Sequence, residues 1–263
     1  MKSLFKNPVT IFASIYFLIV LFWDLTLFIG ADKTTLLHYW FNAGYGLIYL
    51  VAGILGVVYA KRIGFSSVFG KAFAFIGASL VSYGIAQFIW FFYNSYLNVE
   101  MPYPSIADVF FLLFFVLIST GFLFLLNNFK QSITKETIAQ FALMIPVVFI
   151  VSLSTIFRPD FSSDLTLWQN ILNIVYPVSD TILLCIILIM LTVSGGYFRS
   201  TIIFFAVAGM VQLIADFIFT LDTVNGSYWN GGLADLVFTI ASYLFLLSFV
   251  YFMQKMVQES SQA

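Results

Sequence analysis

Residues 85–90 read IAQFIW, and residues 214–219, which begin 129 positions later, read IADFIF. A second pair follows the first at nearly the same spacing, because SIADVFF at 105–111 is matched by GLADLVF at 232–238. Self-similarity at a fixed spacing is the sequence signature of a duplicated structural unit. The sequence therefore predicts a chain built from two related halves.

The composition is that of a membrane protein. The chain is 62% hydrophobic and 9% charged, with a mean hydropathy of +1.02, whereas soluble domains carry about 25% charged residues. Its apolar runs reach the ~20 residues that a transmembrane helix needs, and they lack the alternating pattern of barrel strands. We therefore predict an all-α integral membrane protein with eight transmembrane helices. The predicted spans are 9–30, 36–60, 69–97, 105–128, 134–157, 166–194, 198–222 and 229–254.

The repeated blocks fall in the last two spans of each half, so the spans group as a tandem 4+4 repeat. The first half is 1–131 and the second is 132–263, within a single membrane domain. Each half contains an even number of spans, so both halves insert in the same orientation. A pseudo-two-fold axis along the membrane normal is then expected, as in parallel repeats of some transporters.

The basic residues predict the orientation. Short loops on the cytoplasmic side are enriched in Lys and Arg, and with the N-terminus inside, the outer loops hold only Lys33 and Arg158. We therefore predict a multi-pass protein of a prokaryotic plasma membrane with both termini in the cytoplasm. The basic residues of the predicted inner segments are Lys2, Lys6, Lys61, Arg62, Lys71, Lys130, Lys135, Arg199 and Lys255.

Several classes of function are disfavoured by residue usage. Cys185 is the one cysteine and His38 the one histidine, so disulfides, thiolate metal sites and multi-histidine sites are not expected within one chain. The lysines lie at span ends or in loops, which excludes a retinal Schiff base. The sequence has no nucleophile elbow, phosphate-binding glycine loop or basic stripe for nucleic acid. We expect no cofactor, no metal site and no nucleic-acid partner.

Five carboxylates fall inside predicted spans: Asp24, Asp108, Asp180, Asp216 and Asp235. A carboxylate within the bilayer is energetically costly, which makes it a candidate functional group by default. The sequence offers no basic residue at the same depth. Each acid must therefore be protonated, hydrogen-bonded, hydrated in a cavity or paired with a cation.

Some of these acids also have a purely structural role open to them. Ser105 and Asp108 fit the S-x-x-D capping pattern of a helix start, and Gly232 and Asp235 repeat that spacing. Capping alone could account for both acids. Asp180 is harder to account for in this way, because it follows a proline that removes a backbone N–H and is expected to kink the span.

We predict that these acids and nearby aromatic residues form an outward-facing cavity. Carboxylates and aromatic faces together favour a small cationic or amphipathic ligand. The predicted ligand-binding residues are Asp180, Asp216, Asp108, Asp235, Tyr176, Asn173, Gln87 and Trp90.

Three ordered blocks resemble a known group of membrane regions. PSIADVFFL at 104–112, YPVSD at 176–180 and AD at 215–216 resemble the multi-spanning N-terminal regions of bacterial GGDEF and EAL cyclic-di-GMP signalling proteins and of some histidine kinases. The resemblance covers most of 75–250 and implies a sensory or input module. No cyclase, phosphodiesterase or kinase domain follows in this sequence, so we expect output through a partner protein or through a missing output domain.

Two other functions remain open from the sequence. The parallel repeat and the proline-containing span near the membrane midplane also fit a small-molecule or ion transporter. A pair of aspartates could instead serve as acid and base in a membrane hydrolase of the lysoplasmalogenase type, provided that both reach one cavity. We expect binding rather than catalysis.

Overall fold

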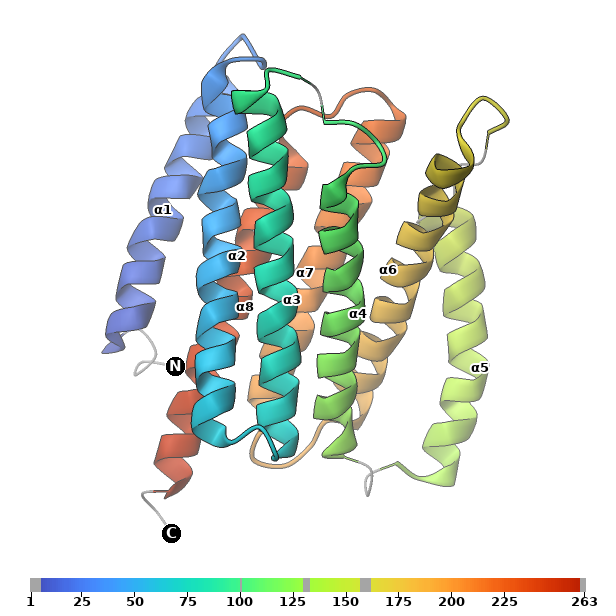
Figure 1. Cartoon of the computed structure of the whole chain (residues 1–263). Helices are drawn as coiled ribbons and strands as arrows, with labels where there is room; N and C mark the ends of the chain where they lie inside the picture. Colours follow the sequence, from blue (N-terminus) through green and yellow to red (C-terminus); the bar gives the residue numbers. More distant parts are fainter. Residues whose placement is uncertain (1–5, 100, 130–132, 157–161, 261–263) are drawn as a thin grey trace.

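The computed structural model describes residues 6–99, 101–129, 133–156 and 162–260. Over these residues the chain forms eight long helices that run alternately up and down a single bundle (Figure 1). Two of them are prolonged by short π-helical segments. In chain order the elements are α1 (Pro8–Ile29), α2 (Leu36–Ile63), α3 (Val68–Phe91), η2 (Phe92–Tyr96), α4 (Ile106–Asn127), α5 (Lys135–Val151), η4 (Ser152–Ile156), α6 (Leu167–Val193), α7 (Arg199–Val224) and α8 (Leu233–Ser260).

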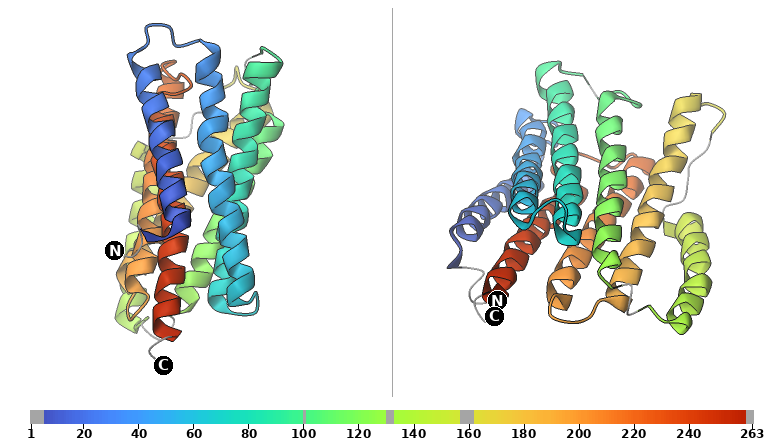
Figure 2. Two further views of the ribbon diagram at one scale, coloured as in Figure 1. Left: turned by 90° about the vertical axis from the view of Figure 1, so that its left-hand side faces the viewer. Right: turned by 60° about the horizontal axis from the view of Figure 1, so that its bottom comes forward.

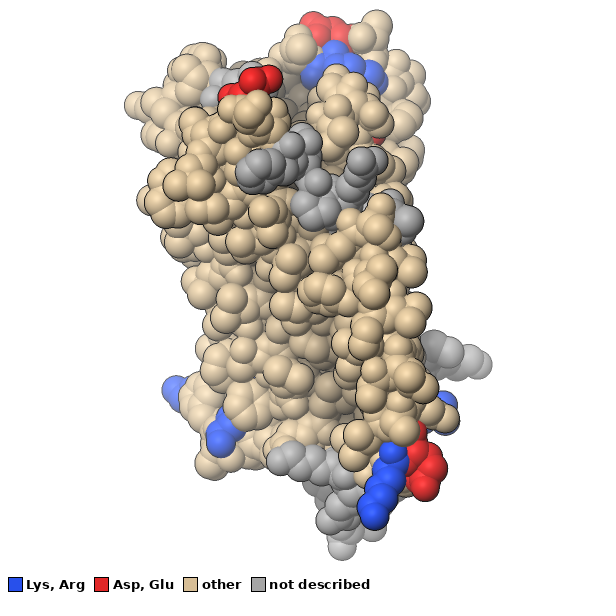
Figure 3. All heavy atoms as spheres, turned by 90° about the vertical axis from the view of Figure 1, so that its right-hand side faces the viewer, with Lys and Arg blue, Asp and Glu red and all other residues tan. Residues whose placement is uncertain are grey.

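All eight helices are long and apolar enough to cross a membrane, which confirms the predicted all-α, multi-spanning class. Seen from the side of α5 and α6, the middle of the molecule is covered by uncharged side chains. The charged atoms gather toward the two ends (Figure 3). This distribution matches a bilayer, whose hydrocarbon core excludes charge.

With η2 and η4 counted in their spans, the predicted spans agree closely with the helices, and the largest differences are at the end of α8, which reaches Ser260 rather than residue 254, and at its start. The sequence placed that start at residue 229, but the helix begins at Leu233. Residues 229–232 form a tight turn, in which the Gly232 N–H donates to the Trp229 carbonyl over 3.1 Å. Gly231 adopts a φ of +83° there, a conformation that glycine reaches without the steric cost of a side chain.

The helices pack as a ring with two helices outside it. Each helix of the ring contacts the next in the order α2, α3, α4, α6, α7 and α8, and α8 contacts α2 to close the ring. Helix α1 packs outside the ring against α2 and α8, whereas α5 packs against α6 at the opposite edge (Figure 2). The start of α1 and the end of α8 lie at the same end of the bundle (Figure 1).

Phenylalanine side chains fill the interior of the bundle near the end that holds the two termini. The Phe73 ring of α3 lies 5.5 Å from Phe205 of α7, 4.9 Å from Phe249 of α8 and 4.7 Å from Phe252 of α8. All four side chains are fully buried. Edge-to-face contacts at these separations are favourable beyond the area that they bury.

Glycines bring α2 and α3 into direct backbone contact. A Cβ atom on Gly53 would lie 2.5 Å from the carbonyl oxygen of Gly77, and one on Gly77 would lie 2.7 Å from the carbonyl oxygen of Gly53. Small residues allow such close approach between membrane helices, where packing replaces the hydrophobic effect as the driving force. We call this contact the glycine seam.

Replacing Gly53 or Gly77 with alanine is expected to destabilise the bundle. The added methyl group would clash with backbone atoms that have no rotamer with which to move aside, so we expect a loss of roughly 1–3 kcal/mol of unfolding free energy. Reversible unfolding in detergent micelles would measure this loss. Gly195→Ala is the control, because a Cβ atom there meets nothing within 4 Å, and equal stability of all three variants would contradict the seam.

Candidate functional site

A polar layer crosses the interior of the ring between α2 and α7. The Tyr49 hydroxyl of α2 donates to Oε1 of Gln212 and lies 3.1 Å from the Phe238 carbonyl oxygen of α8. Gln212 in turn donates from Nε2 to Oδ2 of Asp216, one helical turn further along α7, over 3.3 Å. Because residues four apart share one face of a helix, α7 directs both polar side chains toward the same region.

Asp180 of α6 adjoins this layer and is poorly satisfied. It is buried, and its Oδ1 atom has no hydrogen-bond partner among the described residues. The negative charge of the half-buried Asp216 on the adjacent helix acts on it. Over the same described residues, no lysine or arginine forms an ion pair with either acid. Two interacting carboxylates without a basic partner require a proton or a cation to be stable within a membrane.

Asp235 lies in the first turn of α8 and is well satisfied. It accepts hydrogen bonds from the Tyr45 hydroxyl of α2 at 3.1 Å, from the Gly231 N–H at 2.7 Å and from the Tyr228 hydroxyl at 3.3 Å. Three donors directed at one buried carboxyl group suit its ionised form, which accepts and does not donate. Asp235 thus joins α2, α8 and the loop that precedes α8.

The loop before α8 carries a second junction at Asn230. Its Oδ1 atom accepts from Trp90 Nε1 at 3.0 Å and from Asn42 Nδ2 at 2.7 Å. Tyr228 lies in the same loop, where burial and the nearby charge of Asp235 raise its pKa well above the usual value. Its hydroxyl therefore remains a donor throughout the physiological pH range.

Asp108 forms a related arrangement at the start of α4. It completes a capping box with Ser105, whose N–H donates to Asp108 Oδ2 over 2.6 Å. This confirms the predicted helix-start role. Its other oxygen accepts from the Tyr176 hydroxyl of α6 at 2.7 Å. Nearby, the Tyr103 hydroxyl donates to Asn173 Oδ1 at 2.7 Å, and burial raises the pKa of Tyr103.

The predicted ligand-binding residues thus divide into groups rather than lining one observed cavity. Asp180 and Asp216 lie together between α6 and α7, and Asp108, Tyr176 and Asn173 lie between α4 and α6. The other three occupy further positions: Trp90 and Asp235 belong to the junction around the loop before α8, and Gln87 is buried against Gly46 of α2. The outward-facing cavity itself stays a prediction.

Sequence reasoning missed several partners of these acids. Tyr45 and Tyr49 lie one turn apart on α2, and Gln212 lies one turn before Asp216 on α7. Spacing by four residues could have indicated these pairs. Asn230 had no such signal, because its role depends on the path of the loop before α8.

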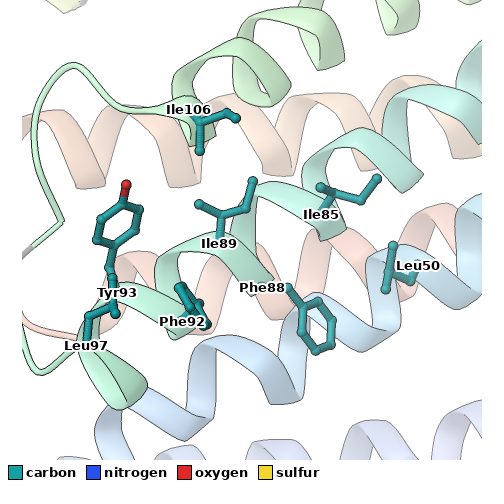
Figure 4. Close-up of a pocket in the computed structure, with 8 residues that line it drawn as sticks. All are labelled: Leu50, Ile85, Phe88, Ile89, Phe92, Tyr93, Leu97 and Ile106. Atoms are coloured by element: carbon teal, nitrogen blue, oxygen red, sulfur yellow. The ribbon is translucent and has the colours of Figure 1, made fainter.

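Two surface grooves have linings that include none of the five acids of the spans. A groove of about 410 Å³ opens on the flank formed by α2, α3 with η2, and the start of α4 (Figure 4). A second of about 270 Å³ lies between α5 and α6. Both have mainly apolar linings, which suit contact with lipid chains. The larger groove is lined by Leu50, Ile85, Phe88, Ile89, Phe92, Tyr93, Leu97 and Ile106.

No group of three or more His, Cys, Asp or Glu side chains that could hold a metal ion occurs within the described part of the chain. No protein-family model, curated protein or solved structure matches the sequence. Functional inference therefore depends on the contacts of the buried polar groups.

Tyr45→Phe tests the junction at Asp235. Removing the hydroxyl leaves a buried carboxyl group with one donor fewer, so we expect a loss of about 1 kcal/mol of unfolding free energy. This loss should disappear when Tyr45→Phe is made in the Asp235→Asn background, as a double-mutant cycle measured by unfolding in detergent would show. Tyr96→Phe is the control, because that side chain is largely exposed, and equal effects of the two substitutions would argue against the hydrogen bond.

Proposed function

We propose that this protein is a membrane-embedded sensory or input module that binds a small cationic or amphipathic ligand at its buried carboxylates. Binding shifts the packing of the helices, and a partner protein or an output domain reads that shift. The site that we propose is centred on Asp180 and Asp216.

The observation that carries the proposal is the interacting carboxylate pair between α6 and α7. Among the described residues, Asp180 is buried with an unpartnered oxygen, and the Asp216 carboxylate accepts one hydrogen bond, from Gln212 over 3.3 Å. A cationic ligand would supply the positive charge that the described surroundings of the pair lack. Tyr49 and Tyr83, whose ring centroids are 4.3 Å apart, stand beside Gln212, and aromatic faces attract cations.

A duplicated architecture is part of this proposal. It is supported by two contacts that exchange under the proposed repeat. Tyr45 of α2 donates to Asp235 of α8, and Tyr176 of α6 donates to Asp108 of α4. The two tyrosines are counterparts when NAGY at 42–45 is aligned with NIVY at 173–176. Helix α2 packs on α8, and α6 packs on α4. Under the proposed repeat α2 corresponds to α6 and α8 to α4, so each of these two packing contacts is the counterpart of the other. A pseudo-two-fold axis parallel to the helices accounts for both sets of contacts.

Under this architecture the proposed site lies where the halves differ. Asp216 stands where the first half has Gln87, so the second half carries an extra carboxylate in its third span. A ligand that binds there would act on α6 and α7 of the second half. It can shift the arrangement of the two halves only to the extent that it binds one arrangement more tightly than another.

The orientation is proposed from charge. The described basic residues other than Lys33 lie toward the end of the bundle that holds the termini, whereas Lys2, Lys130 and Arg158 lie outside the described residues. The positive-inside rule then favours cytoplasmic termini in a prokaryotic plasma membrane. This orientation would place the end of α8 beside a cytoplasmic partner, in keeping with the resemblance to input regions of cyclic-di-GMP signalling proteins and histidine kinases.

Ligand-dependent thermal unfolding tests the proposal. Purified protein in neutral detergent would be titrated with tetraethylammonium, spermidine and dodecyltrimethylammonium, and we expect a saturable rise in midpoint with at least one of them. Asp180→Asn and Asp216→Asn should abolish the rise, because each removes a charge from the pair. Asp164→Asn, in the exposed loop before α6, is the matched control. Unchanged shifts in both pair variants would refute the site.

A transporter is the second candidate, favoured by the exchange of contacts between the two halves. Parallel repeats that rock against one another are a common basis of alternating access. Counterflow of the radiolabelled probe in proteoliposomes separates the two functions. We expect no counterflow from a sensor, and flux that disappears in Asp216→Asn would assign transport instead.

A further inference from the structure

Asp24 of α1 is the most isolated acid of the described chain. Its side chain is fully buried, and neither carboxylate oxygen has a hydrogen-bond partner among the described residues. Val20, Asp24 and Leu27 are buried along one stripe of α1, the helix that packs on α2 and α8. Asp24 therefore faces the protein rather than lipid, and there it must either carry a proton or have its charge compensated.

Asp235 lies close to Asp24 across the contact between α1 and α8. One turn beyond Asp24, Leu27 lies against Gly231, where an added Cβ atom would be 2.8 Å from the Leu27 side chain. The N–H of Gly231 donates to Asp235, and the charge of Asp235 acts on Asp24. The two carboxylates therefore border one region between α1 and α8.

Asn42 adds an unpartnered oxygen, and the hydrogen bonds fix which amide atom it is. The indole N–H of Trp90 can only donate, so the Asn230 atom that it meets must be the acceptor Oδ1. The Asn42 atom that meets the same Oδ1 must then be the donor Nδ2. This leaves Asn42 Oδ1 buried without a partner among the described residues. The Tyr228 hydroxyl lies 3.4 Å from Asn230 Oδ1 and 3.3 Å from Asp235 Oδ2, so the Asn42 side chain belongs to the same group of polar side chains as Asp235.

The two acids of this group differ in the number of hydrogen-bond donors that they receive. Asp235 receives three donors, whereas Asp24 receives none from the described residues, so nothing among them compensates a negative charge on Asp24. Lys33, in the loop after α1, donates instead to the carbonyl oxygens of Leu27 and Phe28 and lies 4.2 Å from the centre of a Trp229 ring. It forms no ion pair with Asp24 within the described residues.

We infer that Asp24, Asn42 and Asp235 form a binding site for one dehydrated monovalent cation, with Na⁺ as the fitting ion. The unpaired atoms are carboxylate and amide oxygens, which hard cations prefer. A divalent ion fits less well, because Mg²⁺ keeps several waters and Ca²⁺ takes six to eight oxygens. The bound ion would tie α1 to α2 and α8, and it would occupy a different site from the ligand proposed at Asp180 and Asp216.

The inferred site belongs to one side of the bundle. Under the proposed repeat, TIFAS at 10–14 aligns with TIAQF at 137–141, which places Val151 of α5 opposite Asp24. Asp108, the counterpart of Asp235, therefore has no second acid at the aligned position. One cation for each chain is expected.

Cation-dependent stability tests the inference on the purified full chain. Its thermal midpoint would be followed while NaCl replaces N-methylglucamine chloride at constant ionic strength. We expect a saturable rise of roughly 5–10 °C once Na⁺ exceeds its Kd a hundredfold. Asp24→Asn should abolish the rise while retaining the fold, because it removes a buried charge and keeps the side-chain shape. Equilibrium binding of ²²Na⁺ should give one ion for each chain, and none in the variant.

Matched variants separate this site from the exposed acids and from the proposed ligand site. Asp32→Asn removes an exposed acid of the loop after α1, which pairs with Thr34, and should keep the Na⁺ response. Asp180→Asn should also keep it, so that failure of the ligand site and failure of the cation site are separate results. A wild-type protein without saturable Na⁺ dependence would overturn the inference, as would an unchanged response in Asp24→Asn. Stability that depends on pH through Asp24 but not on Na⁺ would assign a proton and also overturn it.

Discussion

The cost of a polar group that water cannot reach governs this structure. Within a bilayer, backbone groups are satisfied by forming helices, but side-chain acids must find their own donors. Asp108 and Asp235 do so through tyrosines from neighbouring helices and through backbone N–H groups at helix starts. The same contacts decide which helices are neighbours, because they link α4 to α6 and α2 to α8. Asp24 and Asp180 lack such donors among the described residues, which makes them the informative exceptions.

The fold was largely predictable because long apolar runs permit few alternatives. Span limits agreed to within a few residues except at α8, which starts later because of the turn at Gly231 and extends further, to Ser260. The helix-start role of Asp108 was also predictable, since capping is a local pattern. The partners of the acids were not, because Tyr45, Asn230 and Asp235 meet only after α2 and α8 have packed. Residue spacing describes one helix at a time, whereas these junctions depend on the relative rotation of several.

The proposed ligand and cation sites occupy places where internal resemblance between the halves fails. Asp216 faces Gln87 in the alignment, and Asp24 faces Val151. Matched positions mostly hold helices together, as the two Tyr–Asp contacts do. Unmatched acids add charge without adding a donor. Under the proposed repeat, the positions that the halves share contribute stability, and the proposed chemistry lies at the positions where they differ.

The glycine seam has a mechanical consequence. Because the backbones of α2 and α3 touch at Gly53 and Gly77, sliding one past the other would drive atoms into overlap within a fraction of an ångström. The two helices are therefore expected to move as one rigid unit. Flexibility must therefore lie in another part of the bundle. Helix α5 has no buried side chain and contacts mainly α6, so it is the least constrained helix. Close packing of α2 on α3 and loose packing of α5 make α5 the helix that can move with the smallest loss of buried contacts.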